Sequence, residues 1–169
     1  MNTEHEIYRL KRQIKDLQEF VYKLEENFEK ALELERFHLL RVKNNEQISD
    51  DFILKQQTYR DLSPESAYEL YNDKDSNFIF LDVSMNGFTP FQTIPEAIHI
   101  PLEEIENNLN QIKGRGKKIF IISEDGTRSI LACKVLNKLG YYNLNNISGG
   151  YKYWPGFKVN EQFQQTQSA

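Results

Sequence analysis

The sequence is poor in the residues that most often mark secreted or metal-binding proteins. It has one cysteine and three histidines in 169 residues. A single cysteine excludes an intramolecular disulfide and is typical of a reducing compartment, so we expect a cytoplasmic protein. The histidines lie far apart, at His5, His38 and His99, and form no ligand motif. We therefore predict neither a metal nor a cofactor.

Long apolar runs and an excess of positive charge are also missing. No run approaches the roughly 18 apolar residues of a membrane-spanning helix, and the N-terminus is charged and polar, so we expect no membrane span and no signal peptide. The formal net charge is −4, which argues against a general nucleic-acid binder. Apolar residues make up 39% of the chain, enough for the core of one ordinary domain plus an appendage.

Glycine and proline are absent between about residues 4 and 45. Apolar residues recur there at alternating spacings of three and four over more than three heptads, which predicts a coiled-coil helix over residues 1–45. β-Branched residues at a positions and Leu at d positions favour two parallel strands, hence a parallel homodimer. After Ala31 the spacing shifts by four residues at Leu32, which indicates a stutter. The predicted seam is Ile7, Leu10, Ile14, Leu17, Val21, Leu24 and Phe28.

Two other interpretations of this helix stay open. Phe20, Leu32, Leu34 and Phe37 lie off the strict seam, so the second half of the helix could fold back and cover an apolar face of its own C-terminal domain. The helix could also dock onto a helix of another protein, with the following domain as a folded cap. We favour self-association because isolated helices need a partner and the seam is clean at its N-terminal end.

After a predicted linker over residues 46–57, strand and helix patterns alternate. We expect strands near residues 58–60, 77–83, 97–101 and 118–122, and helices over 64–71 and 102–112. Ser63 followed by Pro64 is typical of a helix start. This alternation predicts an α/β fold, with a parallel sheet covered by helices on both faces.

The stretch from Ile121 to Trp154 holds the candidate site. An apolar strand leads into a six-residue loop and then an amphipathic helix. Strand, tight loop and helix N-terminus together form an anion cradle, because backbone N–H groups and the helix dipole converge there. The candidate site consists of Ser123, Glu124, Asp125, Gly126, Thr127 and Arg128.

Three motifs in this stretch resemble the second half of a rhodanese (sulfurtransferase) domain. The resemblance extends over about residues 58–157 and implies a five-stranded parallel sheet flanked by helices; it leaves 158–169 as a flexible tail. Working members of that family carry their nucleophilic cysteine where this chain has Ser123. The motifs are Ser123-x-x-Gly126-x-Arg128-Ser129, Leu131-Ala132-x-x-x-Leu136-x-x-x-Gly140-Tyr141 and Gly149-Gly150-x-x-x-Trp154.

The first half of the resemblance has further departures. Ser84 replaces the arginine of the family's Asp-Val-Arg, and Thr93 and Glu96 replace the histidine and the glycine of His-Ile-Pro-Gly-Ala. Separate losses of this kind favour natural degeneration over a single engineered change at Ser123.

The chemistry of the loop gives an independent reason to doubt sulfur transfer. A thiolate can carry sulfur as a persulfide, whereas a serine cannot, and a hydroxyl is a poor nucleophile without an adjacent base. Glu124 and Asp125 oppose an anionic donor, with Arg128 and the backbone dipoles in favour. We expect Cys133 in the core. We expect His99 at the sheet edge, about two strands or roughly 10 Å from the loop, in a structural role.

We set aside a phosphatase, because only four residues separate Ser123 from Arg128 and the cysteine is absent. The sequence therefore favours a catalytically silent rhodanese-like domain, dimerised by its helix, that serves as a binding or regulatory module. Its loop would recognise a protein segment or a cationic group. The alternative is a thiosulfate or persulfide sulfurtransferase whose cysteine has become Ser123. No motif identifies the partner, the ligand or the pathway.

Overall fold

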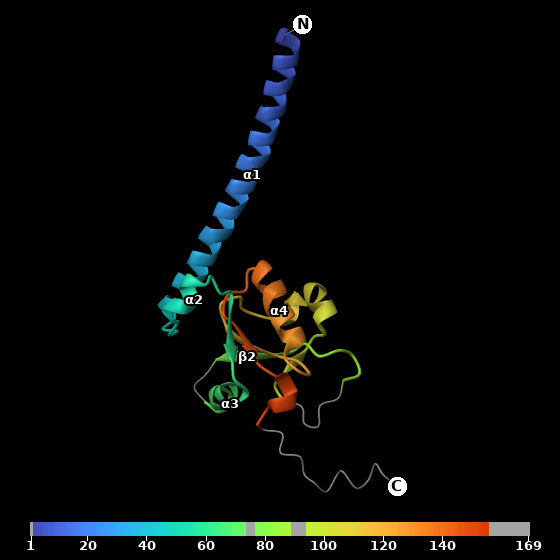
Figure 1. Ribbon diagram of the computed structural model, residues 1–169. Helices are drawn as coiled ribbons and strands as arrows, with labels where there is room; N and C mark the ends of the chain where they lie inside the picture. Colours follow the sequence, from blue (N-terminus) through green and yellow to red (C-terminus); the bar gives the residue numbers. More distant parts are fainter. Residues whose placement is uncertain (1, 74–76, 89–93, 156–169) are drawn as a thin grey trace. The chain divides into compact units, whose positions relative to one another are not determined.

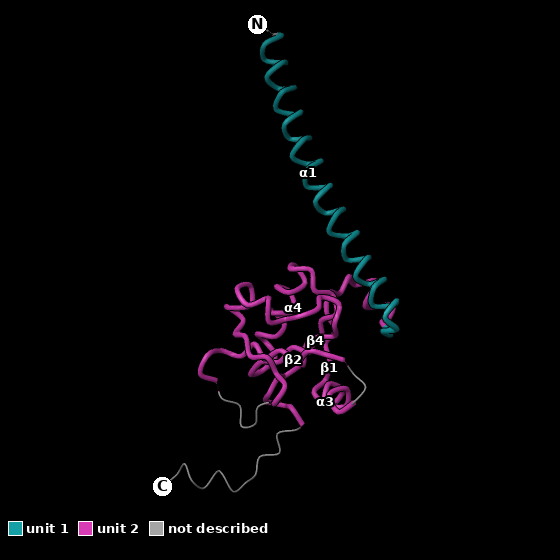
Figure 2. Tube along the Cα trace, turned by 180° about the vertical axis from the view of Figure 1, so that it is seen from behind, with its two compact units in different colours: residues 1–47 teal, residues 48–169 magenta. Residues whose placement is uncertain are grey.

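A computed structural model describes residues 2–73, 77–88 and 94–155. The chain divides into two compact units, Met1–Gln47 and Ile48–Ala169 (Figure 2). The first unit contains one helix, α1 (Asn2–Lys43), which agrees with the long N-terminal helix predicted from the sequence (Figure 1). Its length of 42 residues corresponds to about 63 Å at the usual rise per residue.

The second unit is built on a five-stranded sheet in the order β1-β5-β4-β2-β3, and every neighbouring pair is parallel (Figure 1). This confirms the predicted five-stranded parallel sheet. Its elements are α2 (Asp50–Leu54), β1 (Tyr59–Leu62), α3 (Pro64–Asn72), β2 (Phe78–Asp82), β3 (Ile98–His99), the 3-10 helices η1 (Leu102–Asn107) and η2 (Leu109–Gln111), β4 (Lys118–Ile122), α4 (Thr127–Lys138), β5 (Leu144–Ile147) and the 3-10 helix η3 (Gly150–Tyr153).

The central strand β4 contributes side chains to both hydrophobic clusters of this unit, one on each face of the sheet. Successive side chains of a strand point to opposite faces, so alternate residues of β4 enter different clusters. Figure 1 shows α4 and α3 on opposite sides of the sheet. Complete burial of one Ile side chain contributes about 1.5–3 kcal/mol to stability. The buried isoleucines of β4 therefore hold the end of this strand in place, and the loop begins from a rigid position. The clusters contain Ile119 and Ile121 with Ala132, Cys133 and Leu136 of α4, and Phe120 and Ile122 with Ala67 of α3 and Trp154.

Several local predictions are confirmed. The Ser63 hydroxyl accepts a hydrogen bond from the N–H of Ser66 at 3.2 Å and so caps α3, and Pro64 is its first residue. Cys133 is fully buried in the core. His99 lies on the edge strand β3, which is separated from β4 by β2.

One segment differs from the sequence-based expectation, and a second contains an element that was not predicted. The helix expected over residues 102–112 is instead the two 3-10 helices η1 and η2, which meet at Asn108. The side-chain amide of Asn108 donates to the carbonyl of Glu104 at 2.9 Å, a local bond that competes with a continuous helix. The expected linker over 46–57 contains α2, whose start is capped by Ser49 through the N–H of Phe52 at 3.2 Å.

Candidate functional site

The loop between β4 and α4 is held in a tight conformation by close backbone contacts. Gly126, at the N-cap of α4, has φ +90°. A Cβ at this position would lie 2.7 Å from the nitrogen of Gly149. A Cβ at Gly150 would lie 2.0 Å from the carbonyl oxygen of Ser123. Gly126 and Gly150 are therefore required because the loop packs directly against the start of η3, and this explains the second glycine of the Gly149-Gly150 motif.

The Ser123 side chain is buried and acts as a structural hydrogen-bonding group. Its exposed fraction is 0%. The hydroxyl oxygen accepts from the N–H of Gly126 at 3.1 Å and of Ser129 at 3.3 Å, and its proton goes to the hydroxyl of Ser129 at 3.3 Å. Ser129 in turn donates to the carbonyl of Gly126 at 2.9 Å. Among the described residues, the hydrogen-bond partners of the Ser123 hydroxyl are Gly126 and Ser129, and neither is a base that could activate a serine.

The two acidic side chains of the loop bind N–H groups of the chain itself. Glu124 Oε1 accepts from the N–H of Met85 at 2.7 Å, which ties the loop to the segment that follows β2. Asp125 accepts from the N–H of Thr127 at 2.9 Å, and this hydrogen bond lowers the pKa of Asp125. Both contacts use N–H donors that an anionic ligand would otherwise find at this end of the sheet.

Arg128, the cation of the loop, is held by a carboxylate from another element. Its Nη1 and Nη2 donate to Oε1 and Oε2 of Glu103 on η1, at 2.9 and 2.6 Å. Its Nε donates to the carbonyl of Val83 at 3.0 Å and lies 3.8 Å from Oε2 of Glu124. The hydrogen bonds from Arg128 lower the pKa of Glu103, so that carboxylate stays ionised at neutral pH. The sequence analysis did not identify Glu103 as a residue of the candidate site.

Of the residues that depart from the motif described in the sequence analysis, Ser84 and Glu96 lie in the described part of the chain. Ser84 is buried, and its N–H donates to Asp82 at 2.9 Å. His99 Nε2 lies 3.1 Å from the carbonyl of Ser84, in agreement with the expected structural histidine. Glu96 accepts from the hydroxyl of Tyr71 at 2.6 Å, which raises the pKa of Tyr71 to about 12. Thr93 lies outside the described residues.

A buried hydrogen bond connects the end of β2 to η3, the 3-10 helix against which the loop packs. The hydroxyl of Tyr151 donates to Oδ2 of Asp82 at 2.8 Å. Burial, together with the charge of Asp82, raises the pKa of Tyr151. The phenol therefore remains a neutral donor over the whole physiological range.

We expect Tyr151→Phe to lower the free energy of unfolding by about 1–3 kcal/mol, because a buried carboxylate oxygen loses its donor. Urea unfolding followed by the fluorescence of Trp154 measures this change. Tyr153→Phe on the same 3-10 helix is the matched control, since Tyr153 is 59% exposed. Equal losses in the two variants would contradict a specific role for the buried hydrogen bond.

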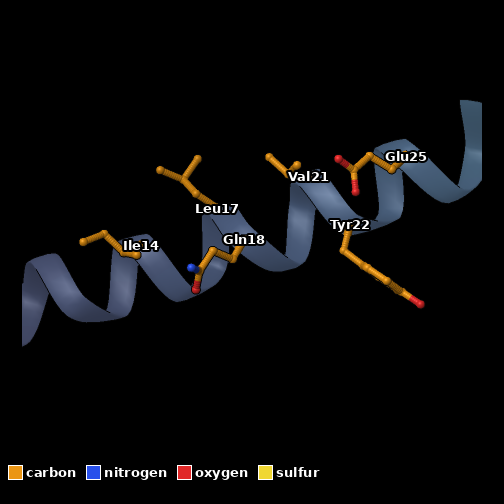
Figure 3. Close-up of a pocket in the computed structure, with 6 residues that line it drawn as sticks. All are labelled: Ile14, Leu17, Gln18, Val21, Tyr22 and Glu25. Carbon is orange, nitrogen blue, oxygen red and sulfur yellow. The ribbon is translucent and has the colours of Figure 1, made fainter.

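The predicted seam of α1 is a continuous exposed apolar stripe. Its seven side chains are between 48% and 62% exposed. Figure 3 shows Ile14, Leu17 and Val21 projecting from the same side of the helix, whereas Tyr22 points away from them. All four residues, together with Gln18 and Glu25, line a shallow groove along the helix surface. The periodicity seen in the sequence is thus present as a physical face of α1.

Within the described ranges, no helix is long and apolar enough to cross a membrane. A search of the same residues finds no group of three or more His, Cys, Asp or Glu side chains that could hold a metal ion.

Comparison with known proteins gives a match to one family. Residues 63–156, more than half of the chain, match the family described as "Rhodanese-like domain". The crystal structure of SSP1007 from Staphylococcus saprophyticus subsp. saprophyticus is 25% identical with a TM-score of 0.52, covering 59% of this chain and 96% of that one. A rhodanese-like domain protein from Staphylococcus aureus is similar in fold, with a TM-score of 0.51 at 23% identity, covering 56% of this chain and 90% of that one.

Curated relatives extend the comparison to named proteins. "Putative sulfur carrier protein YrkF" of Bacillus subtilis (strain 168) is 31% identical over 96 residues, 55% of this chain and 51% of that protein. "Adenylyltransferase and sulfurtransferase UBA4" of Saccharomyces cerevisiae is 26% identical over 117 residues, 62% of this chain and 26% of that protein. The match therefore spans about half the length of YrkF and a quarter of UBA4.

Proposed function

This chain belongs to the rhodanese-like family, and we propose that it is a catalytically silent member that works as a dimeric binding or regulatory module. The observation that carries the proposal is the state of the loop. At the position of the family's nucleophile, the Ser123 hydroxyl is fully buried and bound to two N–H groups of the loop and of α4. Serine cannot form a persulfide, so the fold is retained without the group that performs its chemistry.

The electrostatics of the loop support the same proposal. Thiosulfate carries two negative charges and needs a positive site. Here Arg128 is already paired with Glu103, and Glu124 and Asp125 add two further carboxylates within the loop. The rim therefore favours a cationic or neutral hydrogen-bonding group, and we propose that it recognises a protein segment of that kind.

The exposed stripe on α1 supports the dimeric half of the proposal. An isolated helix gains little stability in water, and seven apolar side chains at heptad positions bury themselves most simply against a second copy. The β-branched residues at a and the Leu residues at d favour two parallel strands. We therefore propose a parallel coiled coil that carries two rhodanese-like domains.

Removal of α1 tests the dimer directly. We expect the full chain at micromolar concentration to have twice the chain mass, and a version that begins at Lys43 to have the mass of one chain. Sedimentation equilibrium measures both. A full chain that stays monomeric would count against self-association, and would favour docking of α1 onto another protein or onto its own domain.

The names of the relatives support a second candidate function. YrkF is named as a sulfur carrier and UBA4 as a sulfurtransferase. By analogy, this chain would be a thiosulfate or persulfide sulfurtransferase whose nucleophile has been replaced by Ser123. A thiosulfate-to-cyanide assay, run on the full chain and on Ser123→Cys, separates this candidate from the silent module.

A further inference from the structure

A surface groove lies between η1 and α4, which pack against each other (Figure 1). It has a volume of about 590 Å³, and its apolar lining comes from Leu102 of η1 and from Leu131 and Val135 of α4. Leu102 and Val135 are partly buried against the core, whereas Leu131 is 47% exposed. The groove therefore offers apolar surface that a partner can remove from water.

The charged side chains beside this apolar lining differ in sign between the two elements. η1 contributes Glu106, and α4 contributes Lys134 and Lys138, which are four residues apart and so lie on one side of the helix. All three are exposed, and none forms an ion pair within the described part of the chain. Glu103 also lines the groove but is paired with Arg128. The groove thus has an acidic border on η1 and a basic border on α4.

A surface with these two borders is complementary to a second copy of itself. In a two-fold symmetric contact, both chains use the same patch. A two-fold axis parallel to the apolar lining places the basic border of each copy against the acidic border of the other, so unlike charges meet twice. A partner of one charge sign would instead be attracted by one border and repelled by the other.

We infer that this groove is a contact between the two domains of the dimer, in which α4 of each copy lies against η1 of the other. The inference rests on the proposed function, because the contact is too small to hold two domains together alone. Seven residues line the groove, whereas a stable interface uses roughly 20–30 on each side. Joining the domains through α1 raises their local concentration to about the millimolar range, at which a weak contact forms.

Charge reversal in the full chain tests this contact. We expect Glu106→Lys and Lys134→Glu each to raise the dissociation constant of the dimer about tenfold at low salt, because each replaces two attractive contacts by two repulsive ones. The double variant Glu106→Lys/Lys134→Glu exchanges the two charges and should restore most of the lost affinity. Sedimentation equilibrium over a range of concentrations measures the parent and the three variants.

Net charge and local contact predict different results for these variants. The parent has a formal charge of −4, so a general charge effect would strengthen the dimer in Glu106→Lys and weaken it in Lys134→Glu. The contact between domains predicts weakening in both. Glu69→Lys is the matched control, because Glu69 is exposed on α3, on the opposite side of the sheet from α4. We expect this control to dimerise at least as tightly as the parent.

The possible failures are distinguishable. A dimer with the same dissociation constant in the parent and in both single reversals would overturn the inference and leave the proposed dimer intact. Weakening that the double variant does not restore would also overturn it, since each change would then act through its own surroundings. A monomeric full chain would refute the dimer and the contact together. Circular dichroism confirms that each variant is folded, and Lys138→Glu, on the same border, replaces Lys134→Glu if that variant unfolds.

Discussion

Neither the full chain nor its Ser123→Cys variant is expected to transfer sulfur from thiosulfate to cyanide at a measurable rate. In this reaction a thiolate attacks the sulfane sulfur, sulfite leaves, and cyanide removes the sulfur from the persulfide as thiocyanate. The parent has no thiol at position 123, and Cys133 is buried in the core. A cysteine at position 123 would lie where the present side chain has no exposed surface. The guanidinium of Arg128 is already paired with Glu103 and so is not available to an anionic donor.

A third variant tests whether sulfur transfer is limited by the carboxylates of Glu103 and Glu124 or by the missing thiol. We expect Ser123→Cys/Glu103→Gln/Glu124→Gln to form thiocyanate at least about tenfold faster than Ser123→Cys, because a dianionic donor can then approach Arg128. Thr127→Cys is the matched control, since it adds a thiol to the same loop at a position without the family's role.

Activity of the parent would overturn the silent-module proposal. Activity of Ser123→Cys alone would show that the cradle still accepts thiosulfate and that loss of the thiol silences it. That result would favour the alternative, a sulfurtransferase that has lost its nucleophile recently or by engineering. If all three proteins and the control are inactive, the proposal of a binding module stands.

Much of the domain could be predicted because its signals are local. The apolar run of β4 and the Ser63-Pro64 start of α3 depend on near neighbours, and both are present as expected. The Gly126 and Gly150 positions could be recognised by spacing, and their close backbone contacts give the physical reason. The failed prediction of one helix over residues 102–112 also has a local cause, the side chain of Asn108, although such competition is difficult to weigh from sequence alone.

The decisive contacts of the candidate site could not be predicted, because they join distant parts of the chain. Glu103 is 25 residues from Arg128, and Met85 is 39 residues from Glu124. Glu103 carried a weak signal, as an acidic residue in the first turn after Pro101. The strand order, which places β2 beside β4, brings Met85 to Glu124, and the packing of η1 against α4 brings Glu103 to Arg128. The sequence therefore indicated an acidic rim without showing that its carboxylates are used internally.

The stripe on α1 leads to the second large expected effect. Leu17→Glu/Leu24→Glu should convert a dimer into a monomer, raising the dissociation constant by about 1,000-fold or more. Each leucine buried at a d position contributes about 1.5–3 kcal/mol, and a dimer loses two copies of each. A factor of ten corresponds to about 1.4 kcal/mol, so the expected loss exceeds three factors of ten.

Tyr8→Glu/Tyr22→Glu is the matched control for this change. Both tyrosines are 69% exposed, lie off the seam and receive the same added charge. Sedimentation equilibrium over a range of concentrations should give a dimer for the control and a monomer for the seam variant, and circular dichroism should show less helix in the seam variant, because an α1 without a partner is marginally stable in water. If the control dissociates and the seam variant does not, the interface lies on the tyrosine face. Dissociation of the seam variant alone ties self-association to the heptad positions, and the two rhodanese-like domains then act as a pair because α1 joins them.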